Sequence, residues 1–74
     1  MFTAILYNSR RPDSTEASGG QMAIANFYTN DSALAFAITA SLGFISGGED
    51  FRTVVAVYNP EGGLMGRYYN GSIF

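Results

Sequence analysis

The residues that could do chemistry in this chain belong to few types. Its 74 residues include no cysteine and no histidine, and all four basic residues are arginines, so lysine is missing as well. The sequence therefore offers no thiolate or imidazole for nucleophilic catalysis or zinc binding. It also lacks the amine that forms Schiff bases. A catalyst built from this chain would rely on carboxylate, hydroxyl or guanidinium groups.

The carboxylates include one adjacent pair, Glu49-Asp50, that could act in acid–base chemistry or bind a hard cation. Neighbouring strand residues point to opposite faces, however, and a pair in a loop usually faces water. A domain of this length also has few elements with which to enclose a ligand pocket of ~300–1,000 Å³. We therefore expect no enzyme, no metal site and no cofactor.

Charge and hydropathy limit the classes of partner. The net charge is −2 and the isoelectric point is near 4.6, which disfavours nucleic acid because a general nucleic-acid binder needs a basic face. The longest uncharged run, Ser32–Gly48, is interrupted by glycine and serine and is too short in apolar sequence to span a membrane. The first residues do not follow the pattern of a signal peptide. We expect a cytoplasmic protein.

Strand-like segments alternate with strong turn signals along the chain. Segments rich in β-branched and aromatic residues predict strands at Met1–Tyr7, Gln21–Tyr28, Phe51–Tyr58 and Leu64–Tyr69, with Ser72–Phe74 as a short additional strand. Residues 9–20 are the most polar stretch, and we interpret them as a mobile loop. No composition change divides the chain, so residues 1–74 form a single domain.

One helix is expected between the second and third strands. Thr29-Asn30-Asp31-Ser32 is a cluster of N-cap residues, and Gly43 suits the left-handed position that follows a helix ending near Leu42. Phe44 could add the apolar contact that often accompanies this cap. Leu34, Ile38 and Leu42 recur at helical spacing and predict the core stripe.

The third and fourth strands are expected to form a hairpin. Pro60 suits a type I turn, and Gly62 suits the left-handed residue of a bulged hairpin. This turn pairs Tyr58 with Leu64 and, without further irregularity, Ala56 with Gly66 and Val54 with Tyr68. The sequence thus predicts an α+β fold: a small two-layer β-β-α-β-β domain in which one helix packs on a face of an antiparallel sheet.

The chain has more apolar surface than such a domain can hide. The predicted helix carries no charge after Asp31, and the last two long strands are apolar or aromatic on both faces. One helix covers only one face of a sheet, so the surplus should meet a partner or a second copy. We expect a self-interface at five apolar residues of these elements: Phe36, Ala40, Val55, Val57 and Met65.

Tyrosine and arginine supply the candidate partner-binding residues, since both are enriched in binding hot spots. They are Arg10, Arg11, Tyr58, Arg67, Tyr68 and Tyr69. The Arg10-Arg11 pair could also grip a carboxylate or phosphate. The competing interpretation is that tyrosines favour strands and that several of them belong to the core.

The sequence therefore favours a non-enzymatic protein-binding module that occupies a partner surface, as an accessory or inhibitor protein does. Small proteins of phages and mobile elements, including inhibitors of bacterial defence systems, are often of this kind, but the association is one of class only. The alternatives are a structural homo-oligomer and a small-ligand binder whose site forms at a subunit interface.

Overall fold

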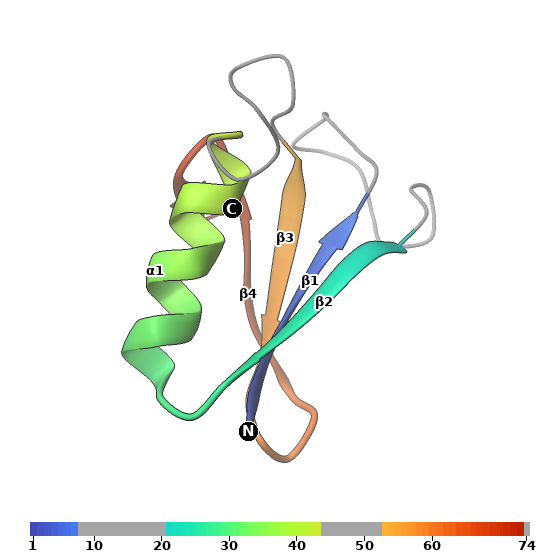
Figure 1. Ribbon diagram of the computed structural model, residues 1–74, viewed down its shortest axis with the longest axis vertical. Coiled ribbons are helices and arrows are strands. Elements are labelled where there is room, and N and C mark those ends of the chain that lie inside the picture. The colour runs from blue at the N-terminus through green and yellow to red at the C-terminus, as the bar shows by residue number, and fades with distance from the viewer. Residues whose placement is uncertain (8–20, 44–52, 74) are drawn as a thin grey trace.

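The computed structural model describes residues 1–7, 21–43 and 53–73, which form one antiparallel sheet and one helix. The strands are β1 (Phe2–Tyr7), β2 (Gln21–Phe27), β3 (Val54–Tyr58), β4 (Leu64–Tyr69) and β5 (Ser72–Ile73), and the helix α1 is Asn30–Ser41. The sheet order is β2-β1-β3-β4-β5, and α1 lies along one side of it (Figure 1). The predicted α+β architecture is confirmed, and the short last strand is its fifth.

The helix begins and ends where its capping residues predict. Thr29 has extended backbone angles, and its Oγ1 accepts a hydrogen bond from the backbone amide of Ser32 at 3.2 Å. At the other end Gly43 has a φ of +92°, the left-handed conformation that glycine adopts without strain, and its amide donates to the Ala40 carbonyl. The predicted contact of Phe44 lies outside the described residues.

The helix packs on the sheet through small side chains. Ala33, Ala37 and Ala40 are fully buried, whereas Ile38 is 40% exposed. Leu34 and Leu42 are half-buried beside the contact. The predicted core stripe of these three larger residues is therefore wrong. An alanine face lets the helix approach the sheet more closely, and the branched side chains then fill the margins.

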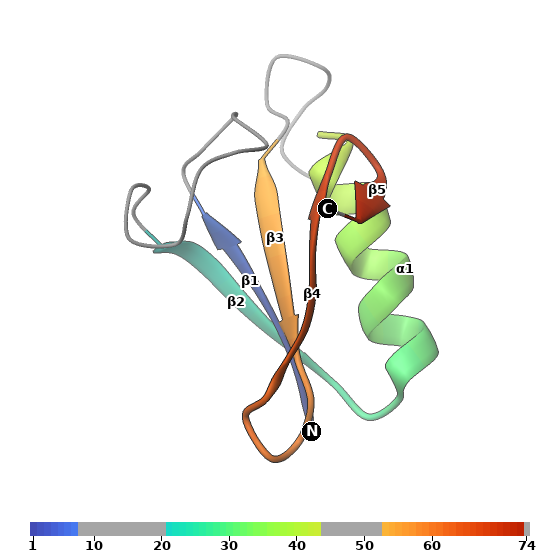
Figure 2. The same ribbon diagram turned by 180° about the vertical axis from the view of Figure 1, so that it is seen from behind.

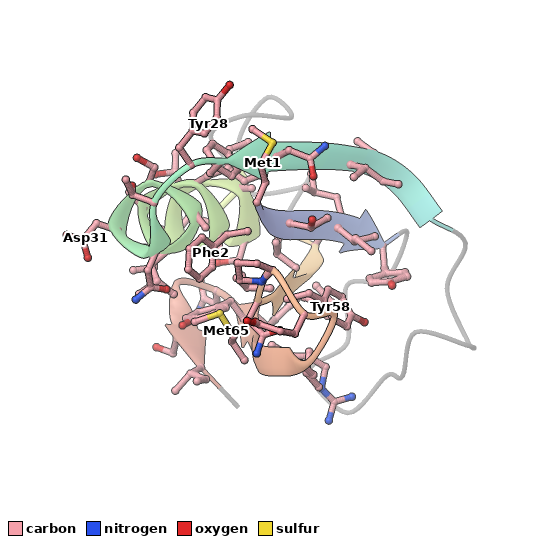
Figure 3. The ribbon with its side chains drawn as sticks, turned by 90° about the horizontal axis from the view of Figure 1, so that it is seen from below. Met1, Phe2, Tyr28, Asp31, Tyr58 and Met65 are labelled. Carbon is pink, nitrogen blue, oxygen red and sulfur yellow. The ribbon has the colours of Figure 1, made fainter. Side chains whose placement is uncertain are left out.

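The core lies between α1 and one face of the sheet. It is formed by seven buried residues with four half-buried aromatic residues at its margin: Ala4, Leu6, Ala33, Ala37, Ala40, Val55 and Val57, with Phe2, Phe27, Phe36 and Tyr68. The rings of Phe27 and Phe36 join β2 to the helix at a centroid distance of 5.2 Å. Figure 3 shows Phe2 between the sheet and the helix.

The hairpin between β3 and β4 has the predicted turn but a different register. Gly62 has a φ of +87°, and the Asn59 amide donates to the Gly63 carbonyl at 2.9 Å. Tyr58 pairs with Leu64 as predicted. An irregularity follows at once, so that Val57 pairs with Gly66 and leaves Met65 as an extra residue.

The bulge at Met65 overturns the rest of the predicted register. Ala56 pairs with Arg67 rather than with Gly66, and Tyr68 pairs with Val55 rather than with Val54. A one-residue insertion moves every later residue of the strand to a new partner. As a result Val55 and Val57 share the helix side of the sheet with Gly66 and Tyr68.

The end of the helix is fastened to the turn between β4 and β5. Ser41 is fully buried; its hydroxyl donates to the Ile38 carbonyl and accepts from the Gly71 amide, both at 2.9 Å. The Ser41 carbonyl accepts from the amide of Asn70. These three hydrogen bonds give the buried Ser41 hydroxyl and carbonyl partners, which offsets the cost of burying them.

We predict that Ala37→Leu lowers the free energy of unfolding by about 1–3 kcal/mol, because the larger side chain has no space between helix and sheet. The matched control is Ala35→Leu, at an exposed position of the same helix, which should change stability by less than about 0.5 kcal/mol. Urea denaturation of both variants checks this. Equal effects would contradict the alanine contact.

Candidate protein-binding surface

The face of the sheet opposite α1 is the candidate binding surface, which we call the helix-free face. Successive strand residues alternate between faces, so the residues that precede and follow each core residue along a strand point away from the helix. Its accessible members come from four strands: Thr3, Ile5, Ile24, Asn26, Tyr58, Arg67 and Tyr69. No helix or strand among the described residues packs over this face (Figures 1 and 2).

The centre of the helix-free face is an alanine flanked by larger side chains. Ala56 is fully buried and pairs with Ile5 on one side and Arg67 on the other. On the same face, Tyr58 is two residues after Ala56 on β3, and Tyr69 is two residues after Arg67 on β4. The register therefore gathers two phenol rings and a guanidinium around one small residue.

Side chains of this face differ in their exposure along the strands. Tyr7 and Val54 pair with each other and are only 8% and 2% exposed, although both point away from the helix. In the row of Ile5 and Ala56, Ile24 is 51% exposed, and at the end away from Tyr7 Thr3 Oγ1 donates a hydrogen bond to Asn26 Oδ1 at 2.9 Å. The accessible side chains therefore extend from Arg67 and Tyr69 on β4, past Tyr58, to β2.

Three of the predicted partner-binding residues meet on the helix-free face, namely Tyr58, Arg67 and Tyr69. Figure 3 shows Tyr58 on the side of the sheet away from the helix. Tyr68 faces the other way and packs against the core, so its assignment to a binding surface is wrong. The predicted sites at Arg10-Arg11 and Glu49-Asp50, and the loop 9–20, lie outside the described residues.

The residues assigned to a self-interface do not form one surface. Ala40, Val55 and Val57 are fully buried and Phe36 packs against them, so these four belong to the core and leave no surface for a second copy. The physical reason is that α1 packs closely on this face of β3 through its alanine side chains. Met65 itself is 38% exposed.

Sequence reasoning did not select Ile5 and Ile24 as surface residues. Alternation along Gln21–Tyr28 did place Ile24 and Asn26 on one face. Which face the helix would cover depended on the pairing of β1 with β2 and β3, in which Ile5 lies between Ile24 and Ala56. That pairing joins residues far apart in sequence and has no local signal.

The described side chains of the helix-free face are of types that suit recognition. Within the described residues Arg67 is the charged side chain of the helix-free face, since Asp31 lies in the first turn of α1 and Glu61 in the hairpin turn. The same residues hold no group of three or more metal-ligand side chains. Arginine between tyrosines presents donors and flat apolar area, which suit carboxylate, carbonyl and aromatic groups of a partner.

The described helix is also not long and apolar enough to cross a membrane. Comparison of the chain with protein-family models, with curated proteins and with solved structures gave no match.

Adjacent tyrosines should respond differently to truncation. We predict that Tyr68→Ala, which removes a ring packed on the core, lowers the free energy of unfolding by about 2 kcal/mol or more. Tyr69→Ala removes a ring from the helix-free face and should cost clearly less. Thermal and urea denaturation compare the two. A larger loss for Tyr69→Ala would contradict the observed register.

Proposed function

We propose that this protein is a non-enzymatic protein-binding module whose helix-free face occupies the surface of a partner protein. The observation that carries the proposal is the grouping of Tyr58, Arg67 and Tyr69 around Ala56 on a sheet face without a covering element among the described residues. Tyrosine and arginine are over-represented in the few residues that dominate binding energy.

The shape of the face supports a protein partner. A sheet face with one small residue at its centre presents a broad surface of modest relief, and standard protein interfaces bury about 800 Å² on each side. Aromatic residues and arginine enrich the centres of such interfaces, while lysine and acidic residues are depleted there. The net charge of −2 disfavours nucleic acid, which would require a basic face.

The biological role that we propose is that of a small accessory or inhibitor protein acting in the cytoplasm. A module of this size works by covering a site on its partner. Proteins of phages and mobile elements that inhibit bacterial defence systems are one class that acts in this way. The composition supports an intracellular role, because small secreted domains commonly depend on a disulfide framework and this chain has no cysteine.

The test begins with the partner recovered from the native host on immobilised protein, purified, and titrated by calorimetry. We predict that Arg67→Ala and Tyr69→Ala each raise the dissociation constant at least about fivefold, equivalent to ~1 kcal/mol, and leave the folded circular dichroism spectrum unchanged. The control is Ile38→Ala, which removes an exposed apolar residue from the outer side of α1 and should leave affinity unchanged.

Loss of affinity in Ile38→Ala with full binding by the Arg67 and Tyr69 variants would move the binding surface to the helix and overturn the proposal. Unfolding of both sheet variants would show that these side chains are structural. In that case Arg67→Lys, which keeps the charge but loses the planar fork, tests recognition in a folded protein.

A further inference from the structure

The two edges of the sheet differ in a way that bears on assembly. One edge is β5, which has only two residues. The other is β2, which has seven residues, none of them charged and none of them proline. Native proteins usually protect a long edge with charge, proline or a covering element, because its unpaired backbone groups invite another strand. Among the described residues nothing pairs with the outer side of β2 (Figure 2).

The hydrogen-bonding pattern identifies the residues whose backbone groups face outward. Asn59 directs its amide and carbonyl across the hairpin toward Gly63 and Gly62. Backbone groups of successive residues in a strand point to alternate sides, so Tyr58, Ala56 and Val54 of β3 direct theirs to β1. The hydrogen bond from the Thr53 hydroxyl to the Tyr7 carbonyl agrees with this direction.

The same alternation continues across β1 to the edge. Thr3, Ile5 and Tyr7 pair with these β3 residues, which leaves Ala4 and Leu6 to bond with β2. Their partners there are Ala25 and Ala23. Ile24 and Asn26, which lie between and beside these alanines, therefore direct their amide and carbonyl groups to the outer edge, where no described strand pairs with them.

We propose that β2 pairs in antiparallel fashion with β2 of a second copy about a twofold axis at Ala25. In this register the outward groups of Ile24 meet those of Asn26 in the second copy, and the reverse pairing follows by symmetry. With a twofold axis at Ile24, Asn26 would pair with residue 22 of the second copy. The β1–β2 register is irregular near residue 22, between Leu6 and Tyr7. The axis at Ala25 uses only the regular part of the strand.

Side chains on both faces suit this register. On the helix side Ala25 faces its own copy, and Ala23 faces Phe27, so that a small residue meets a large one. On the helix-free face Ile24 lies opposite Asn26. Because β2 carries no charge, two copies meet without the like-charge repulsion that normally prevents edge pairing.

Exposed apolar residues beside the edge add contact area. A stable interface buries about 800 Å² on each partner, which is more than the paired backbone of a short strand provides. Ile24 is 51% exposed, Met1 53% and Tyr28 87%. Met1 and Tyr28 lie at the same end of the β1–β2 pair, and Figure 3 shows Tyr28 projecting outward from β2. A second copy is positioned to cover these side chains.

The dimer would join both five-stranded sheets into one continuous sheet, with both helices on one side and both helix-free faces on the other. If the proposed function is correct, each dimer offers two copies of the binding surface, and a partner with two sites gains avidity without any new contact. This last consequence rests on the proposed function, whereas the pairing of β2 does not.

Light scattering on the purified protein, from micromolar to millimolar concentration, should give the mass of a dimer. The absence of native cysteine then allows a single introduced thiol to report the register. In the proposed pairing the two Ala25 Cα atoms lie about 4.5 Å apart, as in a non-hydrogen-bonded pair, which a disulfide can span. Ala25→Cys should therefore form a covalent dimer on mild oxidation.

The matched control is Ala23→Cys, on the same face of the same strand. In the proposed pairing Ala23 lies opposite Phe27, so the two Ala23 residues are four positions apart along the strands and more than about 10 Å from each other. Ala23→Cys should therefore remain largely uncrosslinked. A monomer at every concentration would overturn the proposal. So would a dimer in which Ala23→Cys crosslinks as well as Ala25→Cys, or in which neither does, because each result places the contact elsewhere.

A charge exchange at Ile24 provides a second test. Ile24→Lys and Ile24→Glu each place like charges on diagonal neighbours of the dimer and should raise its dissociation constant by about fivefold. An equimolar mixture of the two variants should restore dimerisation, and failure of the mixture to do so would contradict the pairing. Because these experiments use the protein alone, their failure leaves the proposed function intact, and loss of partner binding in Arg67→Ala leaves the dimer intact.

Discussion

The contact between the alanine face of α1 and the sheet is the interaction on which the rest of the structure depends. Ala33, Ala37 and Ala40 have no exposed surface, and they bring the helix close to Val55 and Val57. A chain this small buries only about 60% of its unfolded surface, so a close and well-packed contact contributes a large share of its stability. The same contact determines which face of the sheet is covered, and no described helix or strand packs over the opposite face (Figures 1 and 2).

The bulge at Met65 determines what that opposite face contains. With regular pairing, Arg67 and Tyr69 would share a face with Val55 and Val57. The extra residue of β4 moves the arginine and the tyrosine to the face opposite these valines, beside Tyr58. Bulges often occur where a strand must redirect side chains for function. Here the bulge separates apolar packing from the side chains best suited to binding, and the proposed function depends on that separation.

Local features of the fold could be predicted from the sequence, and features that depend on distant contacts could not. The caps at Thr29 and Gly43 and the turn at Gly62 involve residues within a few positions of one another, and the strands carry their own composition signal. The rotation of α1 was predicted wrongly, because hydrophobicity favours leucine and isoleucine over alanine whereas close packing favours the smaller residue. The bulge was missed because it has no local sequence signal, and it put Tyr68 on the other face. Tyr58, Arg67 and Tyr69 were selected by residue type, but their proximity could be established only from the register.

We propose that the helix-free face binds a partner protein, and this binding can be followed residue by residue. The most direct measurement is the change in backbone amide chemical shifts of isotope-labelled protein during titration with the purified partner. If this face binds the partner, the largest changes cluster at Ile5, Tyr58 and Arg67, which are distant in sequence and adjacent in the sheet. Changes concentrated on the exposed side of α1, at Ala35 and Ile38, with the sheet residues unaffected, would contradict it.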